Sequence, residues 1–357
     1  MVIYTVVIRC WQYMTGDCHS NNSVNFKMTM DSSIDNCRAQ ALWYTAPGLA
    51  EIREAVLGQL QPDHCLVRTL FSGLSRGTES LVAMGRVCPA DYDRMRAPHM
   101  EGQFPFPVKY GYANVGVVER GPDDLLGQTV FSLSPHQSYF QIATSSITPV
   151  NISVPPLRAL LAANMETALN AIWNGAPGPA DRITIVGGGV VGLLTGYLCA
   201  KLPGAEVTLV DINAARERQA HALGMSFAQL DDAPKECDLV VHASGVASGL
   251  NTAISLAGEE ATILELSWFG SGDIPVALGG AFHSRQLKLI SSQVGHMAAS
   301  RRPRWDYARR LSAAIRLLGD EVLDVLLDEP ISLQSICQHL PRIFNPQSAV
   351  LCQPISY

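Results

Sequence analysis

The spacing of hydrophobic and polar positions changes character near the middle of this chain. Between about residues 38 and 155, short segments rich in β-branched and aromatic residues are bounded by Gly, Pro, Asp or Ser, which is typical of strands in an all-β unit. The clearest of these segments are residues 40–45, 64–71, 115–118 and 129–133. The spacing predicts a β-rich, partly barrel-like first unit.

A helical pattern over 157–174, with a Pro in its first turn, separates this unit from an alternating one. Strand patterns over 183–186, 206–210, 238–242 and 262–266 then alternate with helical patterns over 190–201, 214–223 and 250–256. Strands separated by helices pair in parallel through right-handed crossovers, so we expect an α/β fold with a doubly wound parallel sheet.

The same patterns suggest four segments. Residues 1–37 lack strand or helix periodicity and are expected to be a poorly ordered extension. Residues 38–155 form the β-rich unit and 156–305 the doubly wound unit. Residues 306–357 open with a helical pattern over 307–318 and are expected to return and pack on the β-rich unit.

Composition excludes several classes of function. The 357 residues carry 26 Lys and Arg against 32 Asp and Glu, a net charge of −6, which argues against nucleic-acid binding. Since no apolar run is long enough to span a bilayer, we expect a cytoplasmic protein with no membrane partner. Nine Cys are scattered without a Cys-x-x-Cys pair, which favours reduced, mostly buried thiols.

A glycine motif follows the first parallel strand directly. Gly187, Gly189 and Gly192 fit the G-x-G-x-x-G pattern of dinucleotide-binding folds, and Val190 and Val191 begin the next helix. The first glycine permits a tight turn, the second lets the backbone approach a pyrophosphate, and the third lets helix and strand lie close together. The motif predicts a nicotinamide dinucleotide site at the start of this helix.

Acidic and hydroxyl residues at later strand ends extend this site. Asp211 lies 19 residues beyond Gly192, where a carboxylate accepts hydrogen bonds from the adenosine ribose and repels a 2′-phosphate. We therefore expect NAD(H) to be preferred, while Arg216 leaves NADP(H) open. The alternative is a glycine turn that only packs the sheet, with Asp211 as a helix N-cap. Ser244, Gly245 and Ser267 follow later strands and are further cofactor candidates.

Several sequence segments, in this order along the chain, resemble those of the medium-chain dehydrogenase/reductase superfamily, the relatives of zinc alcohol dehydrogenases. They are residues 71–79, 106–119, 126–131 and 166–171 together with the Gly187 motif, and the resemblance covers about 38–357. It implies a GroES-like, partly open barrel domain beside a Rossmann domain. Residues 72–79 are similar to a subgroup containing the bacteriochlorophyllide hydroxyethyl dehydrogenase, which implies a secondary alcohol on a bulky substrate.

The positions that hold zinc in this superfamily contain other residues here. Ser75 or Arg76 stands in place of the Cys ligand, and Tyr112 replaces the His ligand. Glu166 alone matches a ligand type. No Cys lies between Cys88 and Cys199, so the structural zinc lobe is absent. Because Arg and Tyr are poor zinc ligands, we expect no zinc at either site.

Without zinc, another group must donate to the substrate oxygen. The candidates are Tyr112, Ser75, Thr78, Lys109 and His136, with Tyr112 first, although a packed core aromatic is an equal alternative for it. We expect Lys109 to lower the pKa of Tyr112. His136 is expected to have a surface loop role.

Two carboxylates and one hydroxyl complete the expected site. Glu79 and Glu166 are expected to position Arg76 by charge-assisted pairing. Thr167 occupies the place where the linking helix touches the nicotinamide in the superfamily, so it is a further cofactor candidate.

These observations favour a zinc-independent NAD(P)(H)-dependent dehydrogenase/reductase that interconverts a secondary alcohol and a ketone on a bulky small-molecule substrate. Two alternatives stay open: an NADPH-dependent enoyl or quinone reductase, and a catalytically inactive cofactor-binding partner protein. By analogy with the superfamily, a homodimer is expected.

Overall fold

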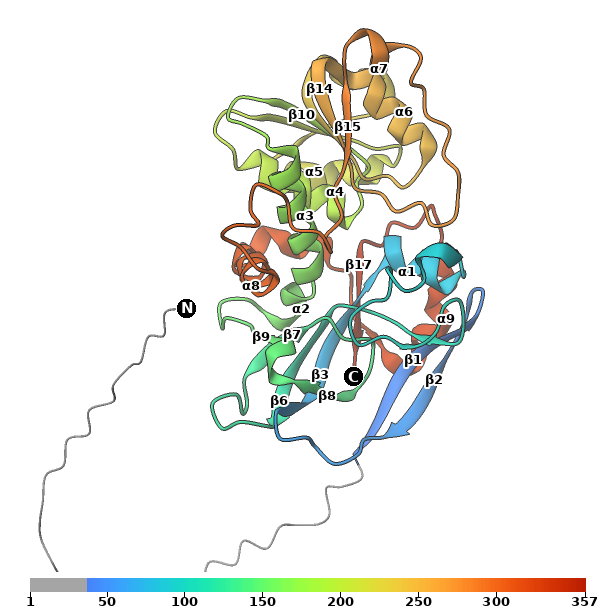
Figure 1. Ribbon diagram of the computed structural model, residues 1–357, viewed down its shortest axis with the longest axis vertical. Helices are drawn as coiled ribbons and strands as arrows, with labels where there is room; N and C mark the ends of the chain where they lie inside the picture. The colour runs from blue at the N-terminus through green and yellow to red at the C-terminus, as the bar shows by residue number, and fades with distance from the viewer. Residues whose placement is uncertain (1–36) are drawn as a thin grey trace, which may run out of the picture. The chain divides into compact units, whose positions relative to one another are not determined.

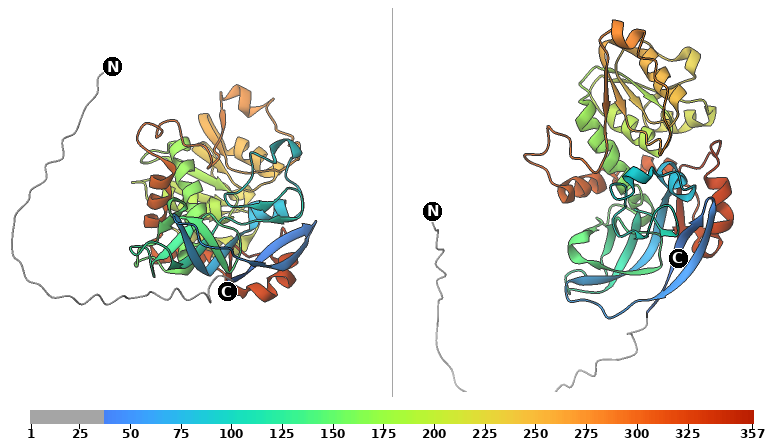
Figure 2. Two further views of the ribbon diagram at one scale, coloured as in Figure 1. Left: turned by 60° about the horizontal axis from the view of Figure 1, so that its bottom comes forward. Right: turned by 45° about the vertical axis from the view of Figure 1, so that its right-hand side comes forward.

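The computed structural model describes residues 37–357, so the extension expected over 1–37 lies, apart from its last residue, outside the described residues. The described chain contains sheets of four, six and seven strands. The six-stranded sheet with its helices makes up one half, and the two other sheets make up the second half (Figures 1 and 2).

The β-rich half is built around one long strand, β3. This strand pairs with β6, β8 and β17, and register shifts near Val67 and Phe71 let it curve from one partner to the next. The seven-stranded sheet has the order β16-β17-β3-β6-β7-β9, with β8 also on β3, and the four-stranded sheet has the order β2-β1-β5-β4. The strands are β1 (Arg38–Ala46), β2 (Leu49–Val56), β3 (His64–Ser75), β4 (Glu101–Gly102), β5 (Val108–Lys109), β6 (Asn114–Arg120), β7 (Thr129–Ser132), β8 (Tyr139–Ala143), β9 (Ile147–Pro149), β16 (Ile331–Ser332) and β17 (Cys352–Ser356).

The helix expected over 157–174 is two helices, α2 (Pro156–Ala159) and α3 (Ala162–Gly175). The break falls at Leu160 and Leu161, whose N–H groups bond to carbonyls three residues back, a tighter turn than an α-helix makes. Helix α3 buries alanines and Met165 against the parallel sheet and ends at Ala176 in a left-handed conformation, with φ of 49°.

The second half is the expected doubly wound sheet, with all strands parallel in the order β12-β11-β10-β13-β14-β15. Strand β10 lies inside it, and its residues 183–186 are buried because helices cover both faces. The chain leaves β10 toward β11 on one side and later occupies β13 on the other, and the carboxyl ends of strands at such a reversal are where doubly wound sheets bind ligands. The elements are β10 (Arg182–Val186), α4 (Val190–Ala200), β11 (Glu206–Val210), α5 (Glu217–Ala222), β12 (Ser226–Ala228), β13 (Cys237–His242), α6 (Ala247–Leu256), β14 (Ala257–Glu265), α7 (Ala281–Ser284) and β15 (Lys288–Ser291).

The last segment crosses back to the β-rich half. Helix α8 (Tyr307–Leu317) packs on α3 and begins at Asp306, whose carboxylate accepts from the Arg309 amide at 2.7 Å. Helix α9 (Leu333–Ile343) packs on β2, and β17 pairs antiparallel with β3. The remaining helices are α1 (Arg76–Ala83) and the short 3-10 helices η2 (Pro89–Asp91), η3 (Thr144–Ser146), η4 (Ala214–Arg216), η5 (Leu230–Asp232) and η6 (Glu321–Leu326).

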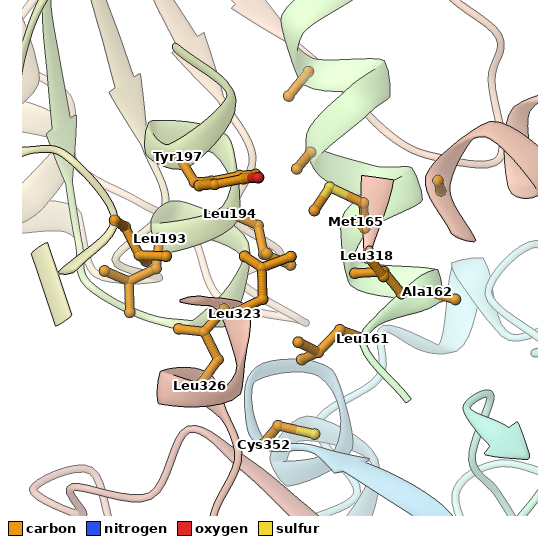
Figure 3. Close-up of a cluster of buried hydrophobic side chains, with 14 of the residues drawn as sticks. Leu161, Ala162, Met165, Leu193, Leu194, Tyr197, Leu318, Leu323, Leu326 and Cys352 are labelled. Atoms are coloured by element: carbon orange, nitrogen blue, oxygen red, sulfur yellow. The ribbon is translucent and has the colours of Figure 1, made fainter. Parts of the chain in front are cut away.

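The main hydrophobic core joins the two halves. Side chains from α3, α4, η6 and β17 converge in it (Figure 3), including Leu161, Met165, Leu194, Leu323 and Cys352. All five are nearly inaccessible to solvent. No helix among residues 37–357 is both long and apolar enough to cross a bilayer.

Truncating this core should lower stability by a predictable amount. Leu323 is fully buried, so Leu323→Ala is expected to lower the free energy of unfolding by about 2–5 kcal/mol, through lost burial and the cavity it leaves. Leu230→Ala, at a position that is 52% exposed, is expected to change it by less than about 0.5 kcal/mol. Urea denaturation measures both, and equal losses would contradict the assignment of this core.

Candidate active site

The three glycines of the motif occupy different environments. Gly187 has a φ of 109°, and a Cβ there would lie 2.6 Å from the Ser244 backbone nitrogen. A Cβ at Gly192 would lie 2.1 Å from the Gly187 carbonyl oxygen. A Cβ at Gly189 would have no atom within 4 Å. The fold itself therefore requires glycine at 187 and 192, whereas Gly189 borders open space.

Helix α4 begins at this open space without a side-chain cap. Gly189 is its N-cap residue, and Val190 and Val191 in its first turn are half-buried. The unpaired N–H groups and the positive end of the helix dipole favour an anion there. These features fit the diphosphate of a nicotinamide dinucleotide, with Gly188, Gly189 and Val190 as the residues that would hold it.

Asp211 is fixed by backbone amides at the end of β11. One carboxylate oxygen accepts from the Gly188 amide at 2.5 Å, and the other accepts from the Asn213 amide at 2.7 Å. The N-cap of η4 is Asn213, which accepts from the Ala215 amide, so the alternative of Asp211 as a helix N-cap is wrong. Each oxygen of Asp211 keeps a lone pair for a further donor.

Two arginines from different halves meet near Asp211. Arg216 is buried and donates to the Ala349 carbonyl at 2.8 Å, while Arg76 donates to the Ser348 carbonyl at 2.6 Å. Burial lowers the pKa of both guanidiniums, and the charge of Arg76 lowers that of Arg216 further. The expected pairing of Arg76 with Glu79 and Glu166 is wrong, because Arg76 instead binds the segment before β17.

Glu166 lies away from the other candidate catalytic residues. Its carboxylate accepts from Arg310 Nε on α8 at 2.9 Å, and both side chains are buried. Burial raises the pKa of Glu166, partly offset by the Arg310 charge. Glu166 thus holds α8 on α3. Thr167, the next residue, is half-buried and donates to the Ala163 carbonyl at 3.0 Å.

The predicted residues Ser244, Gly245 and Ser267 surround the buried imidazole of His242, a residue that was not among the predicted ones. His242 Nε2 lies 2.6 Å from Ser244 Oγ, and Nδ1 lies 2.7 Å from Glu265 Oε2. Ser267 Oγ accepts from the Gly245 amide at 3.1 Å and also reaches His242 Nδ1 at 3.3 Å. The carboxyl ends of β13 and β14 are therefore joined by one hydrogen-bonded network beside Gly187.

The Tyr112 phenol contacts the Ser75 and Thr78 side chains at the start of α1. Ser75 is the last residue of β3 and the N-cap residue of α1. Burial raises the pKa of Tyr112 far above its usual range and the Glu79 charge adds to this, while hydrogen bonds with Ser75 and Thr78 oppose it. The expected effect of Lys109 is wrong. Lys109 pairs with Glu101 and donates to Gln137 at 2.8 Å, and the phenol keeps its proton.

His136 is fully buried, so the surface loop role expected for it is wrong. Its Nε2 lies 2.8 Å from Glu79 Oε2, and its Nδ1 lies 2.7 Å from Ser72 Oγ. Glu79 is also fully buried and accepts from the Ser75 amide at 2.7 Å and from the Tyr44 hydroxyl at 3.3 Å. The two side chains form a polar centre beneath α1.

The zinc positions offer no fitting set of donors within 37–357. No group of three or more His, Cys, Asp or Glu side chains in this range is arranged to hold a metal ion. Ser75 or Arg76 and Tyr112 stand at the superfamily's ligand positions and are poor zinc ligands, and Glu166 is paired with Arg310. Zinc binding needs free, deprotonated ligands, which these residues do not supply.

Comparison with known proteins agrees with this architecture. Residues 162–266 match the family described as alanine dehydrogenase/PNT, C-terminal domain. The D-altritol 5-dehydrogenase of Agrobacterium fabrum is 25% identical over 296 residues, 71% of this chain and 83% of the relative.

Solved structures show the same fold over both halves. A dehydrogenase from Sinorhizobium meliloti 1021 bound to NADP, whose name describes it as zinc-binding, gives a TM-score of 0.71 at 17% identity, covering 90% of this chain and 100% of its own. An alcohol dehydrogenase from E. coli CFT073 complexed with NADH gives a TM-score of 0.72 at 15% identity, covering 90% of this chain and 99% of its own. L-idonate 5-dehydrogenase from Escherichia coli gives a TM-score of 0.71 at 13% identity, covering 90% of this chain and 99% of its own.

The comparisons define the fold of this chain. The chain has the two-domain Rossmann and GroES-like fold of these solved dehydrogenase structures, which confirms the fold class expected from the sequence.

The glycine motif yields a test with a matched control. Gly192→Ala is expected to destabilise the protein, because its Cβ meets the Gly187 carbonyl. Gly189→Ala is expected to leave thermal unfolding unchanged and to weaken NADH binding at least about tenfold, because the Cβ enters the space that the diphosphate needs. Fluorescence titration with NADH measures this, and unchanged affinity in Gly189→Ala would contradict a dinucleotide site here.

Proposed function

We propose that this protein is a zinc-independent, NAD(P)(H)-dependent oxidoreductase of the cytoplasm that interconverts a secondary alcohol and a ketone on a bulky substrate. The observation that carries the proposal is the protonated Tyr112 phenol, set between the Ser75 and Thr78 hydroxyls at the position of a zinc ligand in the superfamily. A phenol that keeps its proton can donate to a carbonyl oxygen in place of a metal ion.

The comparisons support an alcohol–ketone reaction. D-altritol 5-dehydrogenase and L-idonate 5-dehydrogenase are named for position 5 of a polyhydroxy compound, and 2R,3R-butanediol dehydrogenase from Bacillus subtilis has a related fold, with a TM-score of 0.72. The hydroxyl groups at such internal carbons are secondary alcohols. A secondary alcohol is therefore the functional group that we assign to the substrate of this chain.

The cofactor's role is to accept or supply a hydride when bound. On the protein side, the open start of α4 and Asp211 would hold the dinucleotide, and Ser244 and Ser267 lie just beyond the carboxyl ends of the neighbouring strands β13 and β14. We assign NAD(H) as the preferred form. Asp211 disfavours a 2′-phosphate, and the buried Arg216 is already committed to the Ala349 carbonyl.

Tyr112 acts on the substrate oxygen in this proposal. During ketone reduction, its O–H bond breaks as a new O–H bond forms on the substrate oxygen. In alcohol oxidation, the proton moves in the opposite direction. The hydroxyls of Ser75 and Thr78 stabilise the phenolate that forms, since hydrogen bonds to the charged form favour it.

A row of aromatic rings supports a bulky substrate. Tyr92, Phe104, Tyr110 and Tyr112 follow one another with centroid separations of 5.6, 6.0 and 6.1 Å. The row runs from the loop after α1 to Tyr112, and both of its end members are partly accessible. Phe104 and Tyr110 are buried between them, and the two accessible rings, Tyr92 and Tyr112, suit a substrate with an extended apolar surface.

Replacing the phenol tests the proposal. Tyr112→Phe is expected to lower kcat for NADH-dependent ketone reduction by about 10²- to 10⁴-fold, the size of a general-acid contribution. Tyr110→Phe removes a neighbouring buried phenol and is expected to keep most of the activity. Because the pKa of Tyr112 is raised, wild-type reduction should show no loss from its ionisation up to about pH 10.

The same assays separate the alternatives. Unchanged turnover in Tyr112→Phe, or one tightly held zinc per chain by metal analysis, would overturn the proposed chemistry. Reduction of enones or quinones with ketones inert would assign the enoyl/quinone reductase function instead. NADH binding with no turnover of any of these substrates would indicate a cofactor-binding partner protein.

We also propose a homodimer formed through the open edge of the parallel sheet. Strand β15 is the edge strand, and Leu289 and Ile290 on it are each 36% exposed. An exposed apolar edge strand favours pairing with a second copy. Ile290→Lys is expected to shift the protein from dimer to monomer in light scattering after size exclusion. A wild-type monomer would contradict this interface.

A further inference from the structure

A continuous hydrogen-bonded chain runs from Tyr357, a partly exposed residue, to the carboxylate beneath α1. Tyr357, which follows β17, is 36% exposed as a whole residue, while its phenol group lies in a buried environment and its hydroxyl lies 2.7 Å from Ser72 Oγ. Ser72 Oγ lies 2.7 Å from His136 Nδ1, and His136 Nε2 lies 2.8 Å from Glu79 Oε2. Ser72, His136 and Glu79 are fully buried. The chain joins four side chains drawn from four separate segments.

The donors of this chain can all point in one direction. An ionised carboxylate only accepts, so Glu79 accepts from the Ser75 amide, the Tyr44 hydroxyl and His136 Nε2–H. His136 Nδ1 then accepts from the Ser72 hydroxyl, which in turn accepts from the Tyr357 phenol. Burial raises the pKa of Tyr357, so this phenol stays protonated as the outermost donor. Such an alignment lets a proton enter at one end as another leaves at the opposite end.

The negative charge of Glu79 acts electrostatically on the phenols and the thiol around it. Its charge raises the pKa of each of these groups, which come from β1, the segment after β5 and β17. The titratable groups that face it are His136, Tyr44, Tyr110, Tyr112, Tyr357 and Cys352.

We propose that the chain Tyr357–Ser72–His136–Glu79 conducts a proton between solvent and the Glu79 carboxylate, and that this proton compensates the charge created when Tyr112 gives up its own. This role rests on the proposed function, in which Tyr112 is the donor. Ketone reduction consumes one hydride and one proton, and a phenolate next to an ionised Glu79 is costly in a buried site.

The proposed step balances charge. The Tyr112 O–H bond breaks and an O–H bond forms on the substrate oxygen. A solvent proton then passes to Tyr357 as the Tyr357 proton passes to Ser72, the Ser72 proton to His136, and the Nε2 proton to Glu79. Tyr112 and Glu79 together carry one negative charge before and after the transfer. Glu79 and His136 are thus positioning residues for the reaction, since they act through Tyr112.

Histidine NMR on the full-length protein tests the path without requiring turnover. The nine His rings are labelled with ¹⁵N, and His136 is assigned by its loss in His136→Gln. Tyr357→Phe is expected to slow exchange of the His136 ring proton with water at least about tenfold while leaving its titration midpoint unchanged, because a blocked path changes a rate and not an equilibrium. Tyr139→Phe, which removes a half-buried phenol outside the chain, is the matched control and should change neither.

The outcomes are distinguishable. If the His136 ring proton exchanges in Tyr357→Phe at the wild-type rate, the proposed path is wrong. It is also wrong if Tyr139→Phe slows this exchange by the same factor. Ser72→Ala repeats the block inside the chain. If that variant does not fold, Tyr357→Phe still decides, since Tyr357 is partly exposed. If the protein reduces no ketone, the proposed function is wrong. The proton path is still tested in that case, because the exchange rates do not depend on turnover. With activity present, Tyr357→Phe should lower kcat at least about fivefold with KM for NADH unchanged, and an unchanged kcat overturns the coupling to Tyr112.

Discussion

The antiparallel pairing of β17 with β3 is the contact on which the candidate site depends. It sets Cys352 opposite Ser75 and Ser356 opposite Phe71, so residues 277 to 285 positions apart in sequence lie side by side. Without this pairing, Ser72 would have no contact with Tyr357, and Arg76 and Arg216 would lose the carbonyls of Ser348 and Ala349. Five backbone-paired positions therefore hold together groups from both halves of the molecule.

The structural elements predicted correctly are those that depend on residues close together in the sequence. The run 183–186 and the glycines after it set a buried parallel strand and a tight turn, and both follow from residues within one βα unit. His242 and Glu265 were missed, although pairing the ends of two predicted parallel strands would have placed them side by side. His136, Glu79 and Ser72 gave no such signal, because their contacts span 57 and 64 residues and depend on how the barrel closes.

Buried polar groups explain the remaining errors. A sequence shows that Glu166, Lys109 and Arg76 carry charge, but it does not show which partner reaches each of them. Glu166 is satisfied by Arg310 from a helix 144 residues away, and Lys109 by Glu101 on the neighbouring strand. Since a buried charge is costly unless paired, each of these groups takes the partner that the packing supplies. Charge pairing in this fold follows from the packing and gives no independent guide to the reactive centre.

The segment before β17 also has a consequence for motion. Arg76 from the β-rich half and Arg216 from the parallel-sheet half donate to the adjacent carbonyls of Ser348 and Ala349. Any rotation that separates the two halves must break at least one of these bonds or carry the segment along with one half. Residues 348–349 thus bond to both halves at once, so any relative movement of the two halves is coupled to this segment.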